Sequence, residues 1–376
     1  MTTSAPALPP MKTHQLQGIR GLAALLVAVG HCLGLFATPA WFSRLKDYSN
    51  GHAAVVMFFV LSGFVLTLSL QNKHDAPAEF YLKRLFRIYP AWIVACAVSL
   101  GYLALVHFRF PIDGGSEWWS GRFLAERFHP IYIAASFAGA LAFLLPQGWT
   151  IFVEVVASVL MPLIAWSAMR RRGLFYALMA AALIVSLTIG ARTYYGLGSY
   201  LIDFFLGAWL ATPPNAFRKA IAAAEPWTIP SLLLAVAILI AFRNLAPASA
   251  DLGKTGYNDG LVQGVEALCC VWILGVAVYG SRPLRWLDGR VITGLGEISY
   301  SFYLIHLPIM CLLATLVARL PVGPIWRSLT LLAVTLPPSL AVSVLMYRLI
   351  ERPGIALGRR LAEALRRRIG SAAAAQ

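Results

Sequence analysis

Charged residues are scarce in this sequence. Asp, Glu, Lys and Arg together make up 12% of its 376 residues, about half of their share in an ordinary soluble domain. Apolar residues make up 59%, and the mean hydropathy is +0.71. These values exclude a soluble globular enzyme, a disordered chain and a fibrous repeat, and they leave a membrane protein that crosses the bilayer several times.

Acidic residues are the rarer of the two signs of charge, with 16 Asp and Glu against 31 Lys and Arg, so that the net charge is +15. In a membrane protein such an excess reports topology and attraction to anionic lipid headgroups. Nucleic-acid binding is not expected, because no stretch outside the apolar segments combines aromatic side chains with a dense basic patch.

Cysteines are also few, and all five lie inside apolar runs: Cys32, Cys96, Cys269, Cys270 and Cys311. Their spacing fits neither a disulfide framework nor a zinc site, so we interpret them as small buried apolar residues and expect no metal centre. A cleavable signal peptide is not expected either, because no small-residue cleavage pattern follows the first apolar run.

Apolar windows of about 20 residues predict ten transmembrane helices. They lie near residues 16–38, 52–71, 88–108, 148–169, 173–190, 198–212, 227–243, 261–280, 292–318 and 325–349. With the N-terminus inside, the cytoplasmic segments hold 21 Lys and Arg residues and the external segments hold 10, as the positive-inside rule requires.

If a shorter apolar run at 131–145 were an eleventh span, every later span would cross the membrane in the opposite direction. Arg170, Arg171 and Arg172 would then be external, so we interpret this run as a re-entrant or interfacial segment. The sequence thus predicts an all-α polytopic bundle with both termini in the cytoplasm. It divides into a flexible N-terminus (1–15), a transmembrane domain (16–353) and a basic tail (354–376) that forms a helix on the inner leaflet.

Ionisable side chains inside spans are costly and are therefore functional candidates. Five fall on five different spans, in the middle and outer half of the bilayer, with His31 near the midplane: His31, Glu154, Asp203, Glu266 and His306. Their agreement in depth predicts one polar cavity. The alternative for each is a hydrogen bond to a neighbouring helix. The other histidines, including His52, are interpreted as solvated at interfaces or in loops.

A cationic cluster is expected at the cytoplasmic end, where Lys83, Arg84 and Arg87 begin the third span. Arg20 is expected at the same level, on the same helix face as His31 and about 16 Å below it. Guanidinium groups suit phosphate, so a phosphorylated carrier held here is able to extend an arm toward His31. The alternative is simple positive-inside anchoring.

Several motifs together resemble the acyltransferase-3 family of integral membrane acyltransferases. They are Arg20 and His31 with ten residues between them, FFVLSGF ending at Phe64, Arg84 and Arg87 followed by IYP, Trp149 with Glu154, FFLGAWLA at 204–211, LGEISYSFYLIHLPI at 295–309, and Glu351, Arg352 and Pro353. The sequence departs from the family pattern after Glu154, where Val155, Val156 and Ala157 replace the usual aromatic residue.

The resemblance implies transfer of an acyl group, often acetyl from acetyl-CoA, to a hydroxyl, commonly of a cell-surface or exported carbohydrate and sometimes of an antibiotic or a lipid. Arg20, Arg84, Arg87 and Ser62 are then expected to bind the acyl-CoA donor. His31 acts as general base or accepts the acyl group transiently, and Glu154 orients it or takes the base role. Substrate contacts are expected from Asp203, Glu266, Tyr303 and His306, in a stand-alone protein of the bacterial inner membrane.

Two other functional classes remain open on the sequence. A polar cavity with histidines and carboxylates also suits a proton-coupled transporter or flippase, although no paired halves with broken helices are visible. A structural scaffold does not explain five ionisable groups at similar depth. The external loop 109–147 contains Trp118, Trp119 and Tyr132, which suit either stacking on a sugar or an ordinary membrane interface.

Overall fold

The computed structural model describes residues 13–73, 76–105, 112–116, 119, 129–245, 260–280 and 284–374. Within these residues the chain is helical, with one isolated bridge between Phe36 and Gly115. The helices are α1 (Thr13–Gly34), α2 (Ala40–Asp47), α3 (Gly51–Lys73), α4 (Pro77–Leu105), α6 (Pro130–Phe137), α7 (Trp149–Arg170), α8 (Arg172–Thr188), α9 (Leu197–Ala211), α10 (Asn215–Ala223), α11 (Thr228–Leu245), α12 (Gly260–Tyr279), α13 (Arg290–Glu297), α14 (Ser299–Val317), α15 (Pro324–Met346) and α16 (Arg352–Ala374). The prediction of an all-α membrane protein is confirmed.

Seven of the described helices are long and apolar enough to cross a bilayer: α1, α3, α4, α7, α12, α14 and α15. The other three predicted spans correspond to α8, α9 and α11, with 17, 15 and 18 residues. A span needs about 20 residues, with a range of about 17 to 25, so these three helices are close to or below the lower limit and the predicted number of ten spans is not confirmed. The eight-residue α6 is too short to cross, as expected for the segment near 131–145.

Two predicted helix boundaries are corrected by the structure. The third span was placed at 88–108, whereas α4 begins at Pro77. Proline suits the first turn of a helix, and the polar residues that follow find partners inside the bundle, so the helix extends beyond its apolar window. The predicted span 292–318 is divided at Ile298 into α13 and α14.

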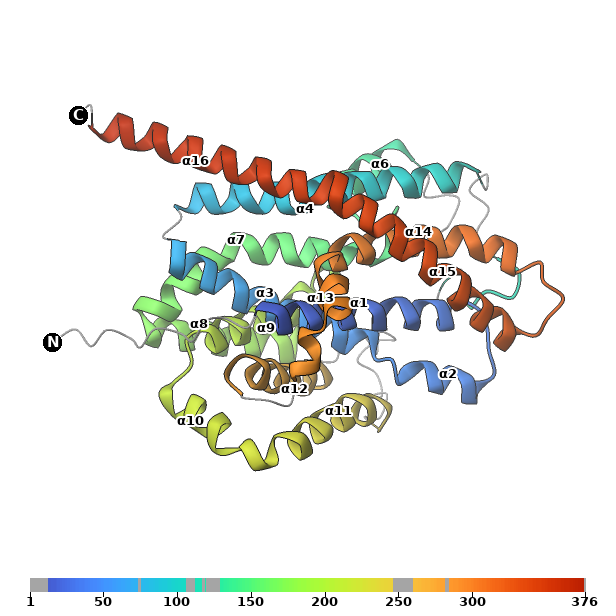
Figure 1. Ribbon diagram of the computed structural model, residues 1–376, viewed down its shortest axis with the longest axis horizontal. Coiled ribbons are helices and arrows are strands. Elements are labelled where there is room, and N and C mark those ends of the chain that lie inside the picture. The colour runs from blue at the N-terminus through green and yellow to red at the C-terminus, as the bar shows by residue number, and fades with distance from the viewer. Residues whose placement is uncertain are drawn as a thin grey trace.

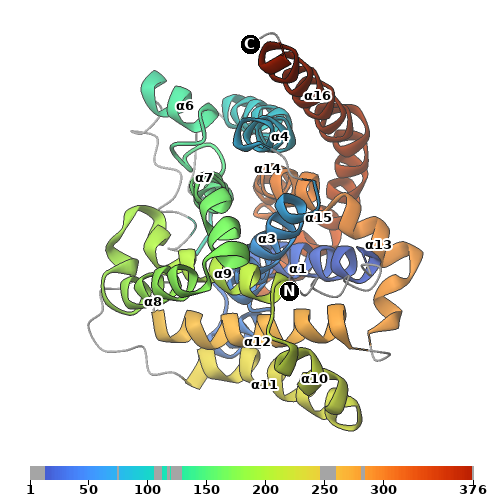
Figure 2. The ribbon, with the colours of Figure 1, turned by 90° about the vertical axis from the view of Figure 1, so that its left-hand side faces the viewer.

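Two views show how the helices are arranged. α4 and α7 run along the long axis in Figure 1 and are seen almost end-on in Figure 2, whereas α12 lies across that direction. The end of α3, the start of α4 and the end of α16 lie at the left of Figure 1. α7 also ends at this side of Figure 1, and its last residue is Arg170. This is the end that the positive-inside rule predicts to be cytoplasmic.

Glycines permit the closest helix contacts around the centre of the bundle. A Cβ at Gly63 would lie 2.3 Å from the Phe204 carbonyl oxygen, and one at Gly207 would lie 2.0 Å from that of Val60. α3 and α9 therefore approach backbone to backbone, as small residues allow in membrane bundles. In the same way, Gly296 brings α13 against Gln17 of α1.

The five cysteines are all buried and form no disulfide, in agreement with their interpretation as small apolar residues.

Candidate active site

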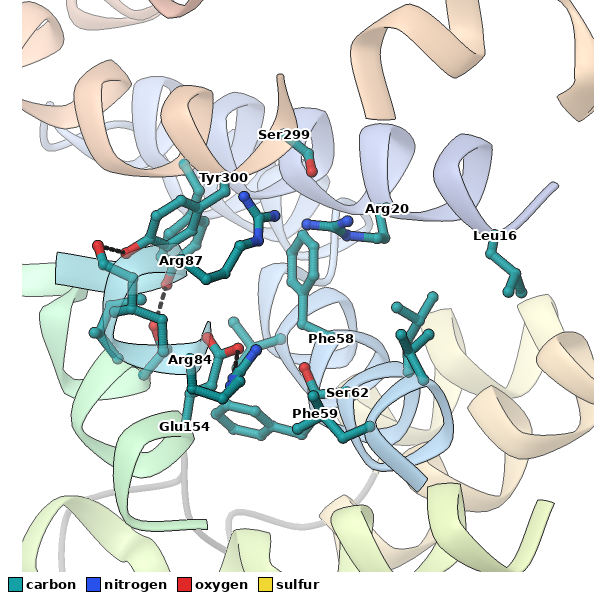
Figure 3. A pocket seen from close by; sticks show the side chains of 18 of the residues that line it. Leu16, Arg20, Phe58, Phe59, Ser62, Arg84, Arg87, Glu154, Ser299 and Tyr300 are labelled. Atoms are coloured by element: carbon teal, nitrogen blue, oxygen red, sulfur yellow. Dashed lines mark hydrogen bonds and ion pairs between the residues drawn. The ribbon is translucent and has the colours of Figure 1, made fainter. Parts of the chain in front are cut away.

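A cavity of about 270 Å³ lies between α1, α3, α4, α7 and α14 (Figure 3). Six of the ten predicted site residues line it: Arg20, Ser62, Arg84, Arg87, Glu154 and Tyr303. Arg20, Arg84 and Arg87 point into the same space from α1 and α4 (Figure 3). Leu16 and Gln17 also line the cavity, so it extends toward the start of α1.

Arg84 and Glu154 form an ion pair across the cavity wall. Arg84 Nη2 donates to Glu154 Oε1 at 2.6 Å, and the same guanidinium donates from Nε and Nη2 to Ser158 Oγ at 3.1 and 3.0 Å. Glu154 was expected to orient His31 or to take the base role, and in the structure its carboxylate is paired with Arg84. The prediction placed Arg84 just below the bilayer, but the early start of α4 brings it inside the bundle.

Arg87 has a carboxylate partner, Glu351, for which the sequence predicted no role beyond the motif Glu351, Arg352 and Pro353. It forms an ion pair with Glu351, whose other oxygen accepts a hydrogen bond from Ser301 Oγ at 2.6 Å. The Arg87 guanidinium also lies 5.4 Å from the centre of the Tyr300 ring. Glu351 is a single acidic residue at the end of the last apolar run. That position could have predicted a cationic partner, because a carboxylate inside a membrane protein needs a cation beside it.

Arg20 differs from the other two arginines. Within the described part of the chain, no hydrogen bond or ion pair joins its guanidinium to another side chain. The three guanidinium groups thus face two carboxylates, Glu154 and Glu351, which leaves one positive charge in excess. A partly buried cation without a counter-ion is costly, and the cavity is chemically suited to an anionic group such as a phosphate.

His31 and His306 form a hydrogen-bonded pair beside the cavity. His31 Nδ1 lies 3.0 Å from His306 Nε2, and His306 Nδ1 lies 3.0 Å from the Phe302 carbonyl oxygen. A carbonyl only accepts, so with both rings neutral His306 Nδ1 carries its proton and Nε2 accepts from His31 Nδ1. This arrangement leaves His31 Nε2 as an acceptor nitrogen, which is the form that a general base requires.

His31 lies in the last turn of α1. The span was predicted to continue to residue 38, but α1 ends at Gly34. The Trp119 ring packs edge-on against His31, with the ring centres 5.5 Å apart. Trp119 is buried, so this member of the external loop belongs to the site, whereas Trp118 lies outside the described residues.

Tyr303 connects the cavity with the histidine pair. It lines the cavity, and its ring centre lies 6.0 Å from that of His306. Its hydroxyl lies 3.0 Å from Thr150 Oγ1, so α7 and α14 are joined at this point. The cationic cavity and the histidine pair are therefore neighbouring parts of one site.

Asp203 and Glu266 lie apart from that cavity, so the predicted single cavity with all five ionisable groups is not what the structure shows. Asp203 is fully buried and accepts a hydrogen bond from Gln263 Nε2 at 3.1 Å. Glu266 is bonded to Asn50 Nδ2 at 2.9 Å and to His52.

His52 itself is 2% exposed and also bonded to the Tyr200 hydroxyl at 2.9 Å. Its interpretation as a solvated interfacial residue is wrong, because α9 and α12 cover the start of α3.

A family model described as an acyltransferase domain matches residues 13–348. A putative membrane-bound transacylase, BcsY from Komagataeibacter xylinus, is 25% identical over 96% of this chain and 87% of its own length. The O-acetyltransferase OatA of Staphylococcus aureus is 24% identical over 78% of this chain, which spans 50% of the length of that relative. "Protein 2 in picA locus" from Rhizobium radiobacter is 30% identical over 47% of this chain and 96% of its own length. No solved structure matches.

Proposed function

The chain belongs to the acyltransferase family described by that domain model and is a multi-pass membrane transferase of the O-acetyltransferase type, and we propose that it moves an acetyl group from acetyl-CoA to a carbohydrate hydroxyl. The observation that carries the proposal is the Arg20 guanidinium, which has no hydrogen-bonded or ion-paired side chain among the described residues, in a cavity that also holds Arg84 and Arg87. An acyl-CoA carries phosphates, which guanidinium groups bind with forked hydrogen bonds.

The donor enters from the cytoplasmic end in this proposal. Leu16 and Gln17, in the first turns of α1, extend the cavity in that direction. The arginines hold anionic groups of the donor, and Ser62 on α3 supplies a hydroxyl at the cavity wall. The thioester end then lies toward Tyr303, which borders His306.

His31 is the general base of the proposed reaction. Its Nε2 accepts the proton of the acceptor hydroxyl while the hydroxyl oxygen attacks the thioester carbon. A C–O bond forms, the C–S bond breaks, and the proton passes to the departing CoA sulfur, so the reaction needs no further reactant. The hydrogen bond from His31 to His306 supports this role because it fixes the tautomer. Glu154 acts indirectly, by holding Arg84 in the cavity wall.

The acceptor is proposed to be a cell-surface or exported carbohydrate that reaches His31 from the outer face. The position of His31 in the last turn of α1, away from Arg20, supports this direction. A relative named an O-acetyltransferase supports a hydroxyl as the group that is acetylated. The bacterial inner membrane is the location that we propose for the protein.

Acetyl-CoA binding to the detergent-purified protein tests the proposal. Isothermal titration of wild type, Arg20→Ala and His31→Ala separates binding from chemistry, and Arg171→Ala, an exposed arginine outside the cavity, is the matched control. We expect Arg20→Ala to weaken binding about tenfold or more, because a hydrogen-bonded charge is lost. His31→Ala and Arg171→Ala should bind as wild type does, and His31→Ala should not transfer acetyl groups.

Two results would contradict the proposal. Failure of the wild-type protein to bind any acyl-CoA would remove the donor site and favour a transporter or flippase. Full acetyl transfer by His31→Ala at normal expression would remove His31 from the mechanism.

A further inference from the structure

We propose that Glu351 is a positioning residue that fixes Arg87 for donor binding, an inference that rests on the proposed function of the cavity. Glu351 ends the π-helical turn Tyr347–Glu351 between α15 and α16, and its side chain is fully buried. It is held from two sides, by the ion pair with Arg87 and by the hydrogen bond from Ser301 Oγ at 2.6 Å. A carboxylate so fixed determines where its guanidinium partner lies.

The contacts of Arg87 leave only part of its guanidinium for a ligand. Nη1 donates to Glu351, and the Tyr300 ring lies 5.4 Å from the guanidinium carbon. Because the guanidinium group is planar, these two contacts fix its orientation. Arg87 lines the cavity, so the remaining N–H groups are presented in a constant direction, as bidentate recognition of a phosphate requires.

The turn that carries Glu351 is fastened to α4 on its other side. A Cβ at Gly354 would lie 2.9 Å from the Phe86 carbonyl oxygen, and one at Gly358 would lie 2.7 Å from Phe86 Cβ. Farther along, Arg366 donates to both oxygens of Glu79 at 3.0 Å (Nε to Oε2), 3.1 Å (Nε to Oε1) and 2.6 Å (Nη2 to Oε2). α16 thus lies along α4 (Figure 1) and holds the π-helical turn against the helix that carries Arg87.

Charge balance alone is the competing explanation for Glu351, and it predicts the opposite sign. If Glu351 only neutralises Arg87, its removal raises the positive charge of the cavity and an anionic donor binds more tightly. If Glu351 positions Arg87, its removal lets the guanidinium move, and the donor binds more weakly although the cavity has become more positive. The direction of the change therefore decides between the two roles.

The experiment compares acetyl-CoA affinities of the full-length protein in detergent for wild type, Glu351→Ala, Glu351→Gln and Arg87→Ala. We expect Kd to rise about tenfold in Glu351→Ala and in Arg87→Ala, the loss of one charge-assisted contact. Glu351→Gln keeps polar atoms for Arg87 and Ser301, so its Kd should rise only about threefold. If Glu351→Ala does not purify in folded form, the direction in which Kd changes in Glu351→Gln decides between positioning and charge balance.

An unchanged or lower Kd in the Glu351 variants, with wild-type binding intact and weakened in Arg87→Ala, would overturn the positioning role and leave the proposed function standing. Absence of binding by wild type would instead remove the proposed function itself. The part played by α16 is tested with Arg366→Ala against the neighbouring exposed Arg367→Ala. We expect Kd to rise about two- to threefold in the first and to stay constant in the second, and equal effects would refute the role of α16.

Discussion

Replacing His306 by Phe is expected to slow acetyl transfer without weakening donor binding. His306 is fully buried and does not line the cavity. Its contribution is the hydrogen bond between its Nε2 and His31 Nδ1, which are 3.0 Å apart, with ring centres 5.3 Å apart and nearly parallel. Phe preserves the ring stacking and removes the acceptor, so the variant isolates the hydrogen bond from the packing.

Two limits bound the size of the effect. Loss of one hydrogen bond of about 1 kcal/mol corresponds to about a fivefold change in rate. Complete loss of general-base catalysis costs about 10²- to 10⁴-fold. Because the Trp119 ring still contacts His31 from another side, the imidazole should keep part of its orientation. We therefore expect kcat to fall by about 10- to 100-fold.

The assay measures release of the CoA thiol in membranes that contain the acceptor, together with the affinity for acetyl-CoA. His306→Gln is the matched control, since its amide oxygen is able to accept from His31 Nδ1, and it should recover part of the lost rate. A wild-type kcat in His306→Phe would refute the tautomer argument. Equal slowing in both variants would show that the ring of His306 matters rather than its acceptor nitrogen.

Three further predictions concern the packing of Gly207, the buried Asp203 and the cysteines. Gly207→Ala should destabilise the protein by about 1–3 kcal/mol, because its Cβ would lie 2.0 Å from the Val60 carbonyl oxygen. Gly264→Ala is the control and should not destabilise it, since nothing lies within 4 Å of its Cβ. Thermal unfolding in detergent measures both. Asp203→Asn should leave the Kd for acetyl-CoA unchanged, since Asp203 contacts Gln263 and not the cavity, and titration as above checks this. A thiol reagent that needs water-exposed cysteine should modify none of the five cysteines until the protein is unfolded, as intact mass will show.

The long helices of this fold were predictable because apolar residues in runs of about 20 have few alternatives to a membrane span. Their ends were not predictable from hydropathy. α4 extends to Pro77 because the polar residues of its first turns find partners in other helices, such as Glu154 for Arg84. Backbone hydrogen bonds continue through such residues, whereas an apolar window ends at them.

The residues of the site were predictable in type but not in their pairing. Arg20, Arg84, Arg87 and Glu154 do line one cavity, yet depth along a helix does not reveal which face of the bundle a side chain occupies. Glu266 was expected at a depth similar to that of Glu154, but it lies on α12, which crosses the bundle and meets the start of α3. The ion pairs of Arg87 and Glu154 likewise depend on how the helices are arranged around the cavity, so the sequence did not predict them.

In the proposed function, the donor and the acceptor approach from opposite faces and meet between the cavity and the histidine pair. The positive charge is concentrated at Arg20, Arg84 and Arg87, while the hydrogen-bonded pair of His31 and His306 lies beyond Tyr303. In the proposed function the phosphates of the donor bind at these arginines and the thioester lies toward the histidine pair. A guanidinium group next to His31 would disfavour the protonated imidazole that forms during the transfer. The proposed chemistry therefore requires that the arginines lie apart from the histidine pair.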